Sequence, residues 1–170
     1  CGRFIDPADH QRGLIYQLHD ISLRRLAERN LHHIAYHDGL TDLANRSCFN
    51  ERLQLAVEHS RTDSAKPFAV VFLDLDHFKV VNDAHSYSVG DEVLRTFARL
   101  LSENARASDL VVRYGGEEFL LVMPQTTLDQ AVLVCERLRR AVADHDWGQV
   151  VPGLRVTVSV GVSSTVQSAG

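Results

Sequence analysis

The feature that most constrains this chain is a glycine pair between two short apolar segments. Leu110–Val112 precedes Gly115-Gly116, and Phe119–Met123 follows it. Two adjacent glycines favour a tight turn, because glycine accepts backbone conformations that other residues avoid. The pattern therefore predicts a β-hairpin over these two segments. The hairpin also carries two carboxylates, since Glu117-Glu118 comes directly after the glycines.

Apolar periodicity predicts the other elements. Phe68–Leu73 is a continuous apolar run of strand length, and alternating valines predict a last strand over Arg155–Val162. The predicted helices are one from an N-cap at Ser22 to about His37, one through Phe49, Leu53 and Val57, a short turn at Phe78–Asn82, and two longer helices at Gly90–Glu103 and Thr127–Asp144. This order predicts an α/β (α+β) sandwich with helices packed on a mainly antiparallel sheet.

Composition narrows the class of protein. The chain has 170 residues, 45% of them hydrophobic, which suits one globular domain and an appendage. The net charge is −4 and the basic residues are scattered, which argues against a nucleic-acid-binding surface. No apolar run approaches the roughly 18 residues of a membrane span, and no signal peptide is visible. Cys1, Cys48 and Cys135 lack metal-binding spacing, so we expect reduced thiols in a cytoplasmic protein.

A second acidic segment follows the first predicted strand of this domain. Asp74 and Asp76 are two residues apart, so in a continuing strand both would face one site. Glu117 and Glu118 are adjacent, so at most one should share that site unless the turn twists the backbone. Taken alone, each feature is equally well explained as a turn former or a polar hairpin tip.

Together, the two acidic segments predict a site for divalent metal. Mg²⁺ is usually held by one or two carboxylates together with substrate phosphates. Two such ions about 4 Å apart activate a hydroxyl group and stabilise a leaving phosphate.

Several motifs, in the same order, resemble the GGDEF family of diguanylate cyclases. They are Asp38-Gly39-Leu40-Thr41, the segment from Asp74-Leu75-Asp76 to Asp83, Gly90-Asp91, and Gly115-Gly116-Glu117-Glu118-Phe119. The likeness runs from about residue 36 to the C-terminus. It implies a palm-like fold related to nucleotide cyclases and polymerases. It also implies that a homodimer condenses two GTP into cyclic di-GMP and releases two pyrophosphates.

The resemblance also implies roles for individual residues. Asp74 would bind metal through its carboxylate, Leu75 through its backbone carbonyl, and Glu117 at the catalytic position beside the 3′-hydroxyl, with Glu118 supporting the metal site. Two Mg²⁺ (or Mn²⁺) ions per active site are expected. Asn82 and Asp91 would read guanine, and Lys79 would lie near the phosphates. The residues expected to contact substrate are Lys79, Asn82, Tyr87, Asp91, Gly115 and Gly116.

A regulatory site is implied by a separate motif. Arg106-Ala107-Ser108-Asp109 ends five residues before the glycine pair, at the spacing of the family's inhibitory site. Arginine binds phosphate or guanine with two hydrogen bonds, so cyclic di-GMP is the expected ligand of Arg106 and Asp109. The alternative is an ordinary ion pair on the surface.

Two departures from the family pattern affect the expected activity. Ser86-Tyr87 stands where the family usually has Gly-His, and that histidine contacts nucleotide. Family members also continue beyond the last strand into a helix with Lys and Arg, whereas this chain ends at Gly170. We therefore expect weak GTP binding and slow turnover from a chain that ends there.

The N-terminal residues suggest a second part of the protein. Tyr16–Ser22, followed by Arg24–Glu28, resembles the end of a PAS sensor running into a signalling helix. The expected domains are therefore residues 1–36, with the sensor end and that helix, and residues 37–170, the GGDEF domain without its C-terminal helix. A segment upstream of Cys1 could attach the full-length protein to a membrane.

The resemblance favours an enzyme over two alternatives. One alternative is a catalytically weak GGDEF domain that binds GTP or cyclic di-GMP and regulates an attached phosphodiesterase or other output domain. The other is an interaction domain whose partner lies on a segment outside this sequence.

Overall fold

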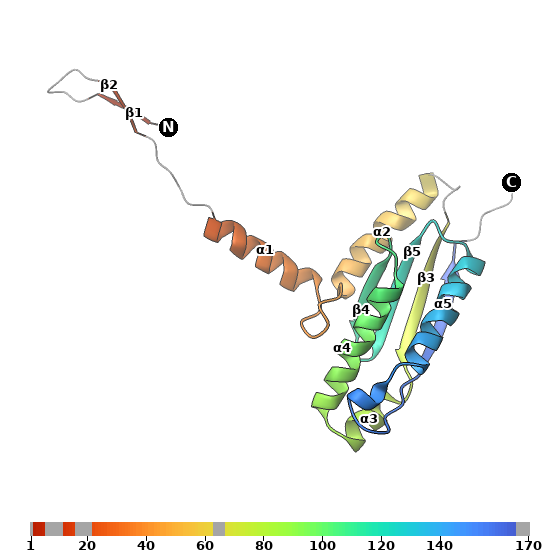
Figure 1. Cartoon of the computed structure of the whole chain (residues 1–170). Helices are drawn as coiled ribbons and strands as arrows, with labels where there is room; N and C mark the ends of the chain where they lie inside the picture. The colour runs from red at the N-terminus through yellow and green to blue at the C-terminus, as the bar shows by residue number, and fades with distance from the viewer. Residues whose placement is uncertain (1, 6–11, 16–21, 63–66, 166–170) are drawn as a thin grey trace. The chain divides into compact units, whose positions relative to one another are not determined.

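The computed structural model describes residues 2–5, 12–15, 22–62 and 67–165 (Figure 1). The chain divides into two compact units, Cys1–His33 and Ile34–Gly170. In the first unit, β1 (Gly2–Ile5) and β2 (Arg12–Ile15) form an antiparallel hairpin. Residues 16–21, which carry half of the PAS-like resemblance, lie outside the described residues.

Helix α1 (Ser22–Tyr36) confirms the predicted N-terminal helix. Ser22 is its first residue rather than the residue before it. Two apolar side chains of this helix, Leu31 and Ile34, are 67% and 72% exposed. None of the helices in the described part of the chain combines the length and hydrophobicity that crossing a membrane requires.

The second unit contains a four-stranded antiparallel sheet in the order β4-β5-β3-β6. Its strands are β3 (Phe68–Leu75), β4 (Leu110–Gly115), β5 (Glu118–Pro124) and β6 (Val158–Ser164). Its helices are α2 (Arg46–Thr62), α3 (Phe78–Ala84), α4 (Tyr87–Asn104) and α5 (Leu128–Ala143), with a 3₁₀ turn η1 at Trp147–Gln149. The chain order from β3 to β6 is that of a ferredoxin-like fold, which confirms the predicted class.

The sheet separates two apolar clusters. Phe119 and Leu121 of β5 pack with side chains of α3, α4 and α5, whereas Leu120 and Val122 pack with Phe49 of α2. This alternation follows from the two-residue period of a strand. Figure 1 shows α4 and α5 crossing the same face of the sheet. The main core therefore lies between the sheet and these two helices.

Side chains at the helix N-termini explain where these helices begin. Thr127 and Gln130 form a capping box at the start of α5. Ser86 accepts a hydrogen bond from Val89 N–H, so α4 starts at Tyr87 and not at Gly90 as predicted. The last strand also differs from the prediction: β6 starts at Val158 and not at Arg155.

Candidate active site

The predicted hairpin is present, but its turn is one residue later than expected. Gly115 pairs with Glu118, so Gly116 and Glu117 form the two-residue connection between β4 and β5. Gly116 has φ 53°, a left-handed conformation that glycine adopts without strain. Glu117 therefore lies in the turn itself, where the alternation of side chains along a strand does not apply.

The turn meets the end of β3 at Asp74. In the ladder, Asp74 lies opposite Glu118, and Leu75 N donates a hydrogen bond to Glu117 O over 3.3 Å. Because Leu75 and Glu117 occupy the hydrogen-bonding position, the adjacent Asp74–Glu118 pair is of the non-hydrogen-bonded kind, which brings side chains closest together. The structure thus brings the predicted residues Asp74, Leu75, Glu117 and Glu118 to one place.

The charges at this place repel one another. The pKa of Asp74 is raised, first by burial and then by the negative charges of Glu117, Glu118 and Asp76. Both glutamates therefore act on Asp74, although strand alternation predicted at most one. In the described part of the chain, no side-chain hydrogen bond or ion pair neutralises Asp74, Glu117 or Glu118. We call these three residues the acidic triad.

Asp76 has a different environment from Asp74. Thr157 Oγ1 donates to Asp76 Oδ2, and Ser159 Oγ donates to Asp76 Oδ1, both over 2.6 Å. These bonds from Ser159 and Thr157 lower the pKa of Asp76. Asp76 thus differs from Asp74 in having both carboxylate oxygens hydrogen-bonded to β6, just after β3 ends at Leu75, and a shared site for the two aspartates stays a prediction.

The oxygen atoms of this edge fit a metal that is shared with a substrate. Among the described residues, no three His, Cys, Asp or Glu side chains gather closely enough to hold a metal ion by themselves. The acidic triad and the Leu75 carbonyl nevertheless provide hard oxygen donors and an excess of negative charge. Such a donor set suits Mg²⁺ that also binds phosphate, rather than an ion held only by protein.

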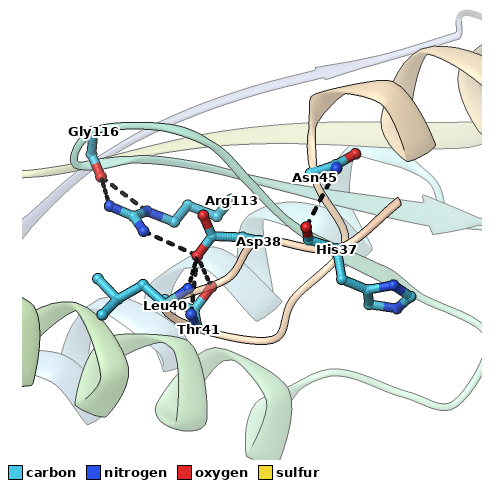
Figure 2. Close-up of polar contacts among 7 residues, drawn as sticks. All are labelled: His37, Asp38, Leu40, Thr41, Asn45, Arg113 and Gly116. Carbon is cyan, nitrogen blue, oxygen red and sulfur yellow. Dashed lines mark hydrogen bonds and ion pairs between the residues drawn. The ribbon is translucent and has the colours of Figure 1, made fainter. Parts of the chain in front are cut away.

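Arg113 bonds both to the Gly116 turn and to Asp38 in the loop before α2 (Figure 2). Its Nε and Nη2 atoms donate to Gly116 O over 3.1 and 3.0 Å, and its Nη1 atom donates to Asp38 Oδ1 over 2.9 Å. Asp38 Oδ1 also accepts from Leu40 N and from Thr41 N and Oγ1. Burial tends to raise the pKa of Asp38, but the bonds from Arg113 and Thr41 outweigh it and the pKa is lowered. We call Asp38, Thr41, Arg113 and Gly116 the turn clasp.

Asn45 joins the clasp loop to two helices. Its Oδ1 atom accepts from Ser47 N and Cys48 N at the start of α2. Its Nδ2 atom donates to the carbonyl oxygens of Ala35 and His37, of which the bond to His37 appears in Figure 2. Asn45 N donates to the carbonyl of Tyr36, the last residue of α1. One side chain thus fixes the last turn of α1 against the first turn of α2.

The predicted guanine-reading residues lie where α3 meets α4. Asn82 is on α3, and a Cβ at Gly90 of α4 would overlap its Oδ1 atom. That Oδ1 atom is buried and has no hydrogen-bond partner. An unpaired buried acceptor is costly, so this position calls for a ligand that donates a hydrogen bond. Asp91 follows Gly90 and is half-buried.

Two other expected substrate residues are exposed. Lys79 lies on α3, one turn before Asn82, and Tyr87 is the first residue of α4, with 79% of its surface exposed. Neither contacts the acidic triad through a bond that the structure shows among the described residues.

The Arg106–Asp109 motif forms a closed turn after α4. Arg106 N donates to Asp109 Oδ2 over 2.8 Å, Asp109 N donates to Arg106 O over 3.0 Å, and Ser108 Oγ donates to Asp109 Oδ1 over 3.4 Å. The described contacts contain no ion pair between the Arg106 guanidinium and Asp109. The alternative of a simple surface ion pair is therefore not what holds these two residues together.

Sequence reasoning assigned no role to several residues that shape this site. Asp38 and Thr41 were part of a matched motif, and an aspartate three residues before a threonine is typical of a side chain that closes its own loop. Arg113 lies two residues before the glycine pair, but nothing in the sequence indicates its partner. Thr157 and Ser159 gave no signal beyond their places in an alternating segment.

The fold and the site define a class of domain: a ferredoxin-like α/β domain with an acidic hairpin turn beside an acidic strand end. The chain belongs to the GGDEF family, because the family model "Diguanylate cyclase, GGDEF domain" matches residues 35–170. Diguanylate cyclases of this family are generally metal-dependent.

Relatives and solved structures agree with this membership. The chain is 40% identical over 147 residues to diguanylate cyclase DgcM of Escherichia coli K12, covering 86% of this chain and 35% of DgcM. It is 38% identical to the response regulator PleD of Caulobacter vibrioides, covering 96% of this chain and 37% of PleD. The coiled coil and GGDEF domain of DgcB from Caulobacter crescentus, solved with c-di-GMP, superposes with a TM-score of 0.75 at 28% identity, covering 85% of this chain and 78% of that one. The chain thus spans little more than a third of the two curated relatives.

Proposed function

We propose that this domain is a diguanylate cyclase, which joins two GTP molecules into cyclic di-GMP and releases two pyrophosphates. The observation that carries the proposal is the convergence of Asp74, Glu117 and Glu118 beside the Leu75 carbonyl, in a chain that belongs to the GGDEF family. Substrate, product and the activity itself are inferred for this chain.

Asp74, Glu117 and the Leu75 carbonyl would hold two Mg²⁺ or Mn²⁺ ions per active site, with Glu118 supporting them. Bound metal supplies positive charge, which lowers the pKa of the attacking 3′-hydroxyl and stabilises the leaving pyrophosphate. Glu117 lies in the turn and is not paired in the β4–β5 ladder, so no cross-strand side chain of β4 lies opposite its carboxylate. The glycines next to it leave room for the triphosphate.

Guanine recognition is assigned to Asn82 and Asp91. The buried Asn82 Oδ1 has no donor in the protein, and the guanine edge offers N1–H and N2–H₂ donors to it and to Asp91. Adenine lacks both donors and would leave these acceptors unpaired, at about 1–3 kcal/mol for each lost partner. GTP is therefore the expected substrate. Lys79 is placed near its phosphates, and Tyr87 stands at the position where the family's histidine contacts nucleotide.

Catalysis is assigned to a two-fold homodimer. Each domain offers one nucleotide site, and the product needs two reciprocal attacks, so two sites must face each other. The exposed Leu31 and Ile34 support α1 as the helix that brings two copies together.

Feedback by product is assigned to Arg106 and Asp109. The Asp109 carboxylate accepts from Arg106 N and Ser108 Oγ, whereas the exposed Arg106 guanidinium has no ion-pair partner among the described residues. A guanidinium in this state can donate two bonds to a phosphate or a guanine of cyclic di-GMP. Arg106→Ala should then remove product binding even in Glu117→Gln, and unchanged affinity would contradict this site.

The proposed setting is a signalling protein in the cytoplasm. Residues 37–170 would form the GGDEF domain, and the preceding residues would form the end of a PAS-like sensor with its signalling helix. The domain would then respond to a signal received upstream of α1.

Incubation of the chain with GTP and Mg²⁺, followed by nucleotide chromatography, tests the main proposal. We expect cyclic di-GMP from the wild type and from Glu103→Gln, a control that neutralises an exposed glutamate on α4. Glu117→Gln should give none. Tight GTP binding without product in the wild type would instead support a regulatory domain that does not turn over its ligand.

A further inference from the structure

The segment that follows β3 is tied to β6 by a second set of bonds, which none of the assigned roles uses. Both oxygens of Asp76 accept hydroxyl hydrogen bonds of 2.6 Å, from Thr157 and Ser159. Asp76 N also donates to Thr157 O over 3.0 Å. Three hydrogen bonds therefore fix the position of a single residue at the end of the strand.

These bonds determine where the neighbouring Leu75 carbonyl points. Leu75 C=O and Asp76 N–H belong to one planar trans peptide and point in opposite directions. Because β3 lies between β5 and β6, an Asp76 N–H directed at Thr157 of β6 directs the Leu75 carbonyl toward β5 and the Glu117 turn.

The Leu75 carbonyl lacks its usual ladder partner there. In a regular antiparallel pair, Leu75 and Glu117 would exchange two hydrogen bonds. The structure contains the bond from Leu75 N to Glu117 O, but the return bond from Glu117 N to Leu75 O is not formed. The turn thus leaves an oriented carbonyl oxygen beside the acidic triad.

We propose that Asp76, Thr157 and Ser159 are positioning residues, which hold the Leu75 carbonyl in the direction needed to bind metal. The inference rests on the proposed function, since it needs a metal at the acidic triad. Asp76 is assigned this indirect role because both of its carboxylate oxygens already accept hydroxyl hydrogen bonds from β6. Outer residues that orient a ligand in this way typically change metal affinity or activity by roughly 10- to 100-fold when they are removed.

The test compares metal affinity with stability in the 170-residue chain. Thr157→Val and Ser159→Ala each remove one hydroxyl group, and Asp76→Asn removes one acceptor oxygen. Ser163→Ala, an exposed serine on the same strand, is the matched control. Mn²⁺ binding is measured by electron paramagnetic resonance with saturating 3′-deoxy-GTP, which cannot condense because it lacks the attacking hydroxyl. Melting temperatures are measured in EDTA.

We expect Thr157→Val and Asp76→Asn to weaken Mn²⁺ binding by about tenfold, and Ser163→Ala to leave it unchanged. Binding of 3′-deoxy-GTP in EDTA should stay within about twofold of wild type in every variant, and high Mg²⁺ should restore turnover in the variants. Wild-type Mn²⁺ affinity in both folded variants would overturn the positioning role while leaving the proposed function intact. If Thr157→Val does not fold, the smaller change Ser159→Ala gives the same comparison. Absence of Mn²⁺ binding in the wild type would overturn both proposals.

Discussion

The two sides of the Gly116 turn differ in how their charges are satisfied. On one side, Asp38 accepts four hydrogen bonds, one of them from Arg113, whose side chain is only 13% exposed. On the other side, no side-chain hydrogen bond from a described residue reaches the acidic triad, and the pKa of Asp74 is raised. The comparison teaches that the hydrogen-bonded carboxylate of Asp38 holds the backbone of the turn, whereas the carboxylates of the acidic triad are left for the expected ligand.

The largest effect should come from neutralising the acidic triad. Glu117→Gln should lower cyclic di-GMP synthesis by at least about 10²–10⁴-fold, because metal binding and help with deprotonation are lost together. The melting temperature without metal should not fall. Initial rates at saturating GTP and Mg²⁺ measure this effect, with Glu103→Gln as the control. Near-normal turnover in Glu117→Gln would contradict the assignment of the acidic triad to catalysis.

A change in the clasp should reduce activity less and stability more. Lysine at position 113 keeps the charge but cannot bond to Gly116 O and Asp38 together. Arg113→Lys should slow turnover by about 10- to 100-fold through a displaced turn and lower the free energy of unfolding by about 1–3 kcal/mol. Arg99→Lys, which alters an exposed ion pair on α4, is the control. Full activity in Arg113→Lys would show that the turn holds its shape without the clasp.

The next prediction concerns Gly90, which lies against the unpaired amide oxygen of Asn82. A methyl group at this position would overlap Asn82 Oδ1 and displace the acceptor assigned to guanine. Gly90→Ala should weaken GTP binding by about tenfold, the cost of one good hydrogen bond, and reduce the preference for GTP over ATP. Calorimetry with both nucleotides measures it. Gly39→Ala is the control, since an added Cβ there meets no atom within 4 Å; equal losses in both variants would contradict the assignment.

The smallest effect concerns stability and pH in EDTA. The pKa of Asp74 is raised in the folded domain, so stability falls as pH rises from the ordinary pKa of aspartate through the raised one and stays lowered above it. Asp74→Asn should therefore raise the melting temperature by about 1–4 °C at pH 7, and the gain should vanish below about pH 4.

Asp76 should behave in the opposite way. The bonds from Ser159 and Thr157 lower its pKa, so its stabilising contribution is present at neutral pH and is lost as pH falls through the lowered value. Asp76→Asn should lower the melting temperature at pH 7. Differential scanning fluorimetry from about pH 2.5 to about pH 7.5 compares the two variants, because both expected changes lie near or below the ordinary pKa of aspartate. A lower melting temperature for Asp74→Asn would contradict the repulsion among these carboxylates.

The sequence was sufficient for the fold and for the meeting of the two acidic segments. The apolar run that ends at Leu73 and the glycine pair each have a local signature, and the antiparallel pairing of β3 with β5 brings Asp74 and Glu117 together. The bond from Arg113 to Asp38 was not predictable, because it joins residues 75 positions apart with no shared period. The hydrogen bonds of Asp76 were also not predicted, since they depend on β3 ending at Leu75 and on two hydroxyl groups of β6.

The Asn45 junction has a consequence for where this domain can be cut or fused to another protein. A fragment that starts at Arg46 would keep every residue assigned to GTP, metal or product. It would lose Asp38, the ion-pair partner of Arg113, and the Asn45 cap of α2. The N-terminal boundary of a working domain is therefore set by residues that never touch a ligand. A graft should keep the chain from Ala35 onward, so that the last turn of α1 stays bonded to Asn45.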